Sequence, residues 1–467
     1  MWRPAVLALA LAGGSAVAGP AVQSWLTTSD QTRLLAPQPV SRFAPGKPLA
    51  LSIDVDSSRR YQSMIGFGAA LTDASAWLIR HKLDDTQRQA LLSELFGRAD
   101  GGAGFGLARL VVGASDFSLK HYSYDDRPAG ETDAALAHFS IDEARGHVLP
   151  VVQQALAINP ALYLIASPWS APGWMKTGGS LIKGRLRPDR FDAFSRYLLR
   201  SVDAFAAEGV SIAALTLQNE PHFEPEDYPG MRLEPADRSK LIAQHLGPML
   251  ASRGGQPQLI EWDHNWDVPE SPLSVLADPQ ANRFIAGVGW HCYGGQVQAQ
   301  SRVHEAYPDK DVWLTECSGG AWAPDWAKSL PWMVNQLVIG STRHWARGVL
   351  LWNLALDEQH GPHLGGCKDC RGVVTIDSKN GAVTRNLEYY ALAHASRFVR
   401  AGARRIASSE AVDGLQNVAF RHEDDGSVVL IACNDAAEAK TFSVRQGVQI
   451  LAYTLPRESV ATLVWRP

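Results

Sequence analysis

The chain has 467 residues, of which 46% are hydrophobic and 20% charged, so it is long enough for a large globular domain with a smaller partner domain. Its formal net charge of −4 argues against nucleic acid or an anionic membrane surface as the main partner.

The first 18 residues have the pattern of a secretory signal peptide. Arg3 supplies the positive charge, Ala5 to Ala12 form a short apolar run, and Ala16-Val17-Ala18 fits the rule of small residues before a cleavage site. This run is shorter than the ~20 residues that cross a bilayer, and no later stretch approaches that length. We expect an exported protein, periplasmic or extracellular, without stable membrane insertion.

Two segments near the N-terminus are predicted strands. Val22–Leu26 and Leu49–Val55 are rich in β-forming residues and flank a proline-rich stretch, residues 37–48. They precede the pattern that dominates the chain, so we expect them to belong to another domain.

From Tyr61 onward, apolar segments suited to buried strands alternate with amphipathic segments suited to helices. Eight strands with helical crossovers predict an α/β fold, a (β/α)₈ barrel. The predicted strands are Ser63–Gly68, Leu107–Val112, Leu162–Ser167, Ile212–Leu217, Gln258–Trp262, Ile285–His291, Val312–Thr315 and Gly348–Leu354. The predicted helices are Asp84–Leu95, Glu143–Ala157, Arg190–Ala207, Pro235–Ala251, Ser271–Ala277, Gln298–Ala306 and Trp326–Arg343.

After Gly402 the pattern changes to short alternating strands. These segments indicate a β-sandwich, and Asp424-Asp425-Gly426 is a hairpin signal within it. Because the strands are too few to close a sandwich alone, we expect the N-terminal strands to complete it. The predicted organisation is a signal peptide (1–18), a barrel (57–399) and one discontinuous β-domain made of residues 19–56 and 400–467.

The ends of the predicted barrel strands carry chemically useful side chains. Parallel barrels place their chemistry at the carboxyl ends of the strands, and two strands deliver a glutamate there, Glu220 and Glu316. Acids, amides and indoles gather at the other strand ends, as in a sugar pocket, where polar groups bind hydroxyls and indole faces stack on pyranose rings. They are Asp116, Trp169, Asn219, Asp263, His264, His291, Tyr293, Trp352 and Asn353.

Two carboxyl groups at one rim favour cleavage of a glycosidic bond. Retention of configuration requires a nucleophilic carboxylate and a second carboxyl as acid and then base, about 5–5.5 Å apart. Asn219, next to Glu220, is suited to bind the 2-hydroxyl. We expect Arg109 to face inward and keep the nucleophile ionised, with His291 and Asn353 as further supporting residues.

Other site classes lack their motifs. His222, His264 and His291 stand in neither a His-x-His nor an HExxH pattern, so no metal is expected. Neither GxSxG nor GxxxxGK[ST] occurs, which argues against a serine hydrolase of that type and a P-loop enzyme. We therefore expect no cofactor.

The five cysteines leave at least one unpaired. Cys367 and Cys370 are separated by two residues in a glycine-rich loop, which favours a local disulfide; redox chemistry and a zinc site are the alternatives. Cys317 follows Glu316 and points away from it in an extended strand, so we expect it to pack in the core. An assignment for Cys292 does not follow from spacing.

Ordered motifs along nearly the whole chain resemble glycoside hydrolase family 30, close to its glucosylceramidase (acid β-glucosidase) branch. They are Gln62–Asp73, Ser115–Ser118, Ser167–Pro172, Gln218–Pro221, Thr315-Glu316, Trp352–Leu356, Tyr389–Ala391 and Arg397–Ala403. The loop of Cys367 and Cys370 is more similar to bacterial members, and Cys292 stands where the animal enzymes tend to carry an aromatic residue.

The resemblance implies a retaining β-glycosidase with Glu220 as acid/base and Glu316 as nucleophile. It also implies a glucose-binding set, with Tyr293 at the rim, that matches Asp116, Trp169, Asn219 and Trp352.

The resemblance gives a β-glucoside as the partner, either a glycolipid or a β-glucan. A glucosylceramidase-type β-glucosidase is the first expectation; an endo-β-1,6-glucanase, and then a β-xylosidase or β-fucosidase, are the alternatives within the family. A non-catalytic carbohydrate-binding protein is the alternative from another class, because a fold alone does not imply activity. The sequence carries no signal for an oligomeric state.

Overall fold

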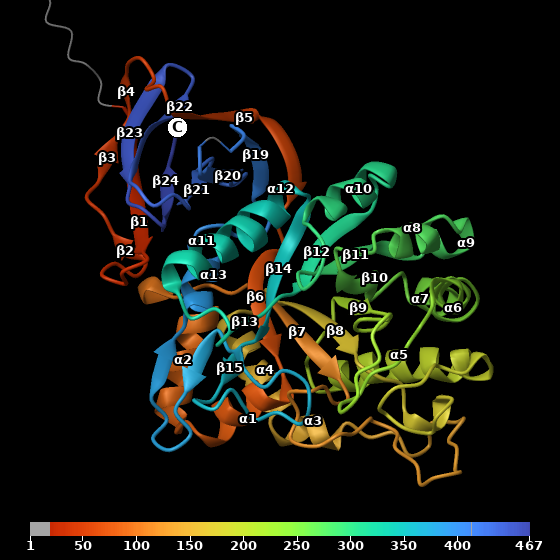
Figure 1. The fold of residues 1–467 in the computed structure, drawn as a ribbon. Coiled ribbons are helices and arrows are strands. Elements are labelled where there is room, and N and C mark those ends of the chain that lie inside the picture. The colour runs from red at the N-terminus through yellow and green to blue at the C-terminus, as the bar shows by residue number, and fades with distance from the viewer. Residues whose placement is uncertain (1–18, 412) are drawn as a thin grey trace, which may run out of the picture.

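The computed structural model describes residues 19–411 and 413–467, so the predicted signal peptide lies outside the described residues. Eight parallel strands close into a barrel, which confirms the predicted (β/α)₈ fold, and they follow one another around it in chain order (Figure 1). The strands are β6 (Gly66–Leu71), β7 (Leu107–Val112), β8 (Tyr163–Pro168), β9 (Ala214–Thr216), β10 (Gln258–Asn265), β11 (Ile285–His291), β12 (Asp311–Glu316) and β14 (Ala346–Asn353).

The barrel strands are apolar because both of their faces are covered. Every residue of β6 and β7 is buried, as expected for parallel strands between a packed interior and an outer layer of helices. The interior is a packed core, so the strand ends are the part of the barrel left for chemistry. One interior cluster joins six strands through Leu107, Ile165, Ala214, Ile260, Trp313 and Leu350.

The helical layer follows the predicted order, but three helices lie outside the predicted ranges: α1 (Asp73–His81), α9 (Pro279–Asn282) and α13 (Leu387–Ser396). Helix α1 buries Asp73 and Ser75 together with its apolar residues. The other helices are α2 (Asp85–Phe96), α3 (Asp142–Gly146), α4 (Val148–Ile158), α5 (Phe191–Ala207), α6 (Pro235–Leu241), α7 (Gly247–Ser252), α8 (Glu270–Leu276), α10 (Gln298–Ala306), α11 (Trp326–Met333) and α12 (Ser341–Arg343).

The second domain combines both ends of the chain, as predicted, and Figure 1 shows its red N-terminal strands among blue C-terminal ones. The first strand pairs along its length with the last, and β5 lies between β19 and β22. β5 runs on to Ser63, past the expected boundary at residue 56. The strands are β1 (Ala21–Thr28), β2 (Ala36–Pro37), β3 (Ser41–Arg42), β4 (Ala44–Pro45), β5 (Ser52–Ser63), β19 (Arg404–Ser408), β20 (Leu415–Arg421), β21 (Val428–Asn434), β22 (Lys440–Gln446), β23 (Gln449–Leu455) and β24 (Ser459–Trp465).

The two domains meet at α13, the last barrel helix. The buried imidazole of His394 lies 2.8 Å from the hydroxyl of Thr27 on β1 and 2.9 Å from that of Thr462 on β24. One side chain thus ties both chain ends to the barrel. Among the described residues, no helix combines the length and the apolar content that crossing a bilayer requires.

Candidate active site

The carboxyl ends of the barrel strands surround a cavity of about 500 Å³. Each residue predicted to be catalytic or to bind substrate lies in its wall, and the structure thereby brings together side chains that are far apart in the sequence. They are Asp116, Trp169, Asn219, Glu220, Tyr293, Glu316 and Trp352.

Glu220 enters this cavity through an unusual backbone turn. Neighbouring side chains in an extended strand point to opposite faces, yet Asn219 and Glu220 both line the cavity. The left-handed backbone of Glu220, with φ of +47°, breaks the alternation after β9. The amide N–H of Glu220 donates to the carbonyl of Asp263 at 3.0 Å, which fixes the turn.

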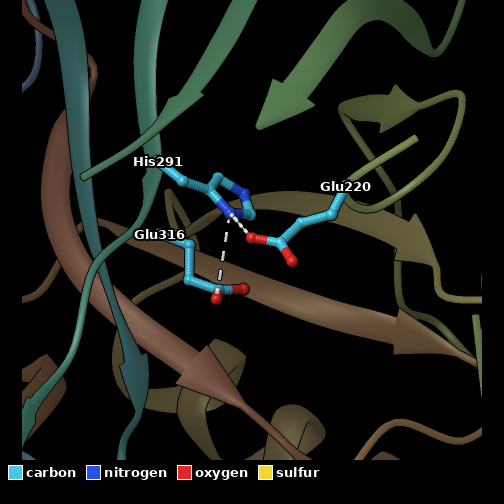
Figure 2. A group of neighbouring side chains, drawn as sticks. All are labelled: Glu220, His291 and Glu316. Carbon is cyan, nitrogen blue, oxygen red and sulfur yellow. Dashed lines mark hydrogen bonds and ion pairs between the residues drawn. The ribbon is translucent and has the colours of Figure 1, made fainter. Parts of the chain in front are cut away.

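Glu316 and His291 end two neighbouring strands, β12 and β11, and they are paired in register. The Nδ1 atom of His291 lies 3.0 Å from Oε1 of Glu220 and 3.9 Å from Oε1 of Glu316. One ligand atom from each of the three side chains lies within 4.8 Å of the others. Figure 2 shows the two carboxylates next to each other, with the imidazole beside them.

Arg109, on β7, holds the floor of the site. Its fully buried guanidinium donates to Glu316 through Nη1. Its Nη2 donates to Asp263 Oδ2 at 2.7 Å, to Asn219 Oδ1 at 2.8 Å and to Ser167 Oγ at 3.2 Å. The structure places this arginine inward, as expected, and its contacts give the buried carboxylates a fixed positive partner.

Aromatic side chains form the remaining walls. The indoles of Trp169 and Trp352 stack with ring centres 4.9 Å apart, and the guanidinium carbon of Arg109 lies 4.7 Å from the Trp169 ring centre. Tyr293 stands at the rim, 47% exposed, and its hydroxyl donates to Glu316 Oε1 at 2.9 Å. Glu316 is therefore held from two sides, by Arg109 and by Tyr293.

His291 carries a positive charge at neutral pH. Burial alone would lower its pKa, but the negative charge of Glu316 and hydrogen bonds with Asp263 and Glu220 raise the pKa of His291 to about 9. The charged ring donates from Nδ1 to Glu220 and from Nε2 to Asp263, each at 3.0 Å. Despite its burial, Asp263 keeps a pKa well below the usual range, because Arg109 and His291 favour its charged form.

The two glutamates have different electrostatic surroundings. Burial raises the pKa of Glu316, against the opposing charges of His291 and Arg109. Burial acts on Glu220 in the same sense, but the hydrogen bond from His291 outweighs it and lowers the pKa of Glu220. In this arrangement, without a sugar, the negative charge is favoured more on Glu220 than on Glu316.

Asp116 is a buried carboxyl with a raised pKa. Burial and the charge of Glu316 raise the pKa of Asp116 to about 8, so at neutral pH the group is mostly protonated and can donate a hydrogen bond. The loop of Gly366 packs closely against it: a Cβ on Gly366 would lie 2.4 Å from the Asp116 Cβ, and Gly366 has a φ of +66°. Only glycine fits this approach without strain.

Asn353, predicted as a supporting residue, is buried behind the cavity wall, as Arg109 and His291 are. Its Oδ1 accepts a hydrogen bond from the Thr72 hydroxyl at 2.8 Å, and Thr72 caps helix α1. This hydrogen bond joins the end of β14 to the start of α1.

Several wall residues were missed by sequence reasoning because they come from loops without a periodic pattern. Their aromatic side chains, in the long loops after the strands, were the signal that could have found them. The missed residues are Phe223, Tyr228 and Trp322.

A metal ion has a geometrically possible donor set in Glu220, His291 and Glu316. Both nitrogens of His291 already bond carboxylates, and Glu316 already accepts from Arg109. A cation would have to displace these bonds and approach a buried guanidinium. The expectation of a metal-free site stays a prediction.

Two disulfides lie at the site. The predicted bond between Cys367 and Cys370 is confirmed, and both residues line the cavity. A second bond, which the sequence did not predict, joins Cys292 to Cys317, and Cys317 is buried in the core as expected. The physical reason for this bond is strand pairing: the cysteines follow His291 and Glu316 on adjacent strands, which brings their Cα atoms to 5.3 Å. Cys433 is buried and free.

We expect the double substitution Cys292→Ala/Cys317→Ala to lower the free energy of unfolding by about 2–4 kcal/mol, because this bond closes a loop of sequence separation 25. The matched control is Cys367→Ala/Cys370→Ala, whose bond spans a separation of 3 and constrains the unfolded chain less. Urea unfolding of the three proteins measures the difference. Equal losses in the two variants would contradict the prediction.

Comparison with known proteins matches this geometry. Residues 64–399 match the glycosyl hydrolase family 30 TIM-barrel domain, and residues 402–463 match the family 30 beta-sandwich domain. The chain belongs to glycoside hydrolase family 30. This makes the protein a glycoside hydrolase, as the resemblance of its motifs implied.

Three relatives within the family cover most of the chain. An endo-1,6-beta-D-glucanase of Neurospora crassa is 32% identical, over 99% of this chain and 98% of its own. The mouse lysosomal acid glucosylceramidase is 27% identical, over 89% of this chain and 84% of its own. The solved structure of an endo-beta1,6-glucanase superposes with a TM-score of 0.88 at 31% identity, covering 96% of this chain and 99% of that one.

Proposed function

We propose that this family 30 hydrolase is an endo-β-1,6-glucanase that cleaves β-glucosidic bonds with retention of configuration. The relatives named endo-1,6-glucanases are 32% and 31% identical to the chain, whereas the mouse glucosylceramidase is 27% identical. This supports the alternative within the family over the glucosylceramidase expected first from sequence.

The distance between the two glutamates carries the mechanistic part of the proposal. Retaining enzymes hold their carboxyl groups about 5–5.5 Å apart, whereas inverting enzymes leave about 6.5–9.5 Å for a water molecule. Carboxylate oxygens of Glu220 and Glu316 lie within 4.8 Å of each other. This spacing favours direct attack by a carboxylate over attack by an interposed water.

In the proposed reaction Glu316 attacks the anomeric carbon while Glu220 protonates the departing oxygen. A covalent glycosyl–Glu316 ester forms, and Glu220 then takes a proton from the water that hydrolyses it. Asn219, beside the acid and held by Arg109, is placed to bind the 2-hydroxyl of the sugar. Trp169, Trp352 and the protonated Asp116 bind the rest of the ring.

The reaction requires a protonated Glu220 and an ionised Glu316 when the sugar is bound. The hydrogen bond from His291 to Glu220 opposes this distribution, because it lowers the pKa of Glu220. A glycosidic oxygen that enters between His291 and Glu220 breaks this hydrogen bond. The pKa of Glu220 then rises, and a proton is favoured on Glu220 over Glu316. The hydrogen bonds from Arg109 and Tyr293 then favour the negative charge on Glu316.

Export of the protein is part of the proposal. The two disulfides are of a kind that persists in oxidising compartments, which agrees with the signal pattern of residues 1–18. A β-glucan outside the cell is accessible to such an enzyme.

Product analysis tests the proposed substrate. We expect the protein to convert β-1,6-glucan into a ladder of short oligosaccharides, because an endo enzyme cuts inner linkages, and the first products to keep the β configuration in NMR spectra. Glucosylceramide, tested in parallel, should be cleaved far more slowly. Release of glucose alone, or a preference for glucosylceramide, would contradict the proposal and favour the acid β-glucosidase type.

A further inference from the structure

A second cavity adjoins the catalytic one. It measures about 330 Å³, and its wall includes Trp322, Trp332, Lys328, Ser318 and Ser329. These residues come from the loop that follows β12 and from helix α11. The Trp322 side chain also lines the catalytic cavity, so the two cavities share one wall.

The shared indole rests on a supported stretch of backbone. A Cβ on Gly320 would lie 1.9 Å from the six-membered ring of Trp322, so the ring packs directly on the glycine. Gly320 belongs to β13 (Gly319–Gly320), which pairs with β16 (Cys370–Arg371). Arg371 in turn donates to the buried Glu388 at 2.8 Å. Trp322 is thus held in position although its side chain is largely in solvent.

The second indole projects from a well-packed helix. On α11, Leu330, Pro331 and Met333 are buried, while Trp332 is 45% exposed. Trp322 is 54% exposed. Two exposed indoles around one concavity, with an amine and hydroxyls beside them, form a surface of the kind that binds ligands.

We propose that this second cavity binds one further glucosyl unit of a β-glucan chain, adjacent to the unit held in the catalytic cavity; the inference rests on the proposed function. The electron-rich face of an indole attracts the C–H groups of a pyranose ring, which carry small positive charges. The Lys328 amine can donate to sugar hydroxyls, and the Ser318 and Ser329 oxygens, whose protons are donated to backbone carbonyls, can accept from them. A volume of about 330 Å³ lies at the lower end of the range for small-ligand pockets, as a single sugar requires.

Two kinds of substrate should differ in the cavities that they occupy. An aryl glucoside occupies only the catalytic cavity, whereas a glucan chain reaches across Trp322 into the second one. Binding energy from the second cavity therefore favours chains over small glucosides.

The variants Trp332→Ala and Trp332→Phe test this, because Trp332 lines only the second cavity. For Trp332→Ala we expect KM for β-1,6-linked gluco-oligosaccharides of four or more units to rise about tenfold. kcat on these chains, and kcat/KM on 4-nitrophenyl β-glucoside, should stay unchanged. Trp332→Phe should recover part of the loss. Leu49→Ala, which removes an apolar side chain that is 43% exposed on the β-domain side, is the matched control, and thermal unfolding is measured for all variants.

Two failures are distinguishable. If the unmodified protein cleaves β-1,6-glucan and Trp332→Ala has the same KM for long oligosaccharides, the second cavity is not a sugar site and the proposed function stands. An equal loss on the aryl glucoside likewise overturns the inference, because it marks a general structural effect. If the unmodified protein does not cleave β-1,6-glucan, the proposed function itself fails and the inference fails with it.

Discussion

Replacing Glu316 by glutamine is expected to lower kcat on β-glucosides by at least ~10⁴-fold, because an amide cannot form the covalent sugar ester. The substitution preserves side-chain shape, so Tyr293 keeps a hydrogen-bonding partner there. Arg109 loses one carboxylate but keeps Asp263 at 2.7 Å. The loss should therefore be chemical rather than structural, and steady-state kinetics with unfolding curves separate the two effects.

Labelling identifies the nucleophile directly. A 2-deoxy-2-fluoroglucoside with a good leaving group should form a long-lived ester, and mass spectrometry of peptides should place the added mass on Glu316. The variant Glu316→Gln should remain unlabelled. Glu305→Gln, at an exposed position on α10, is the matched control and should keep full activity and labelling. Full activity in Glu316→Gln, or a label on another residue, would end the assignment.

The barrel could be predicted from sequence because each of its strands is marked by a local pattern of residues. Each strand is a short apolar run, since both faces of a parallel strand are buried, and each strand end is marked by a change to polar residues. Glu220 and Glu316 stand at two such ends, which is why their convergence followed from topology alone. Both strands were found at the expected places in the barrel.

The parts that could not be predicted depend on register and on loops. The Cys292–Cys317 bond requires that β11 and β12 be adjacent with His291 opposite Glu316, and this pairing is absent from any local pattern. The turn that brings Glu220 inward depends on the Asp263 carbonyl of the neighbouring strand β10.

The charges in the site could not be predicted from local sequence either. Sequence suggested one cation, Arg109, among the carboxylates, whereas the structure adds His291 as a second, bonded to Glu220 and Asp263. Three surrounding acids, which meet only in the folded chain, raise the pKa of this histidine and so favour its charged form.

The substitution Glu220→Ala should have an effect that depends on the leaving group. When a β-1,6-glucan is cleaved, the leaving group is a sugar alkoxide, which departs poorly without protonation. Cleavage of the glucan should therefore slow by about 10²–10⁴-fold. From a dinitrophenyl glucoside the dinitrophenolate leaves without protonation, so formation of the glycosyl–Glu316 ester should be almost unaffected. Hydrolysis of that ester then becomes slow, because no base activates water, and a burst of dinitrophenol should precede the steady state.

Azide provides the decisive measurement for Glu220→Ala. This anion attacks the ester without the help of a base, and the space left by the side chain admits it, so added azide should restore turnover of the dinitrophenyl glucoside. The product should be the β-glucosyl azide, because a second inversion at the anomeric carbon returns the original configuration. The variant Glu226→Ala, which removes a highly exposed carboxylate from the same cavity wall, should show neither the burst nor the rescue. Equal losses on both substrates, without azide rescue, would mean that Glu220 serves to position His291 rather than to transfer protons. An α-glucosyl azide would instead contradict the double displacement itself, whatever the roles of the two carboxylates.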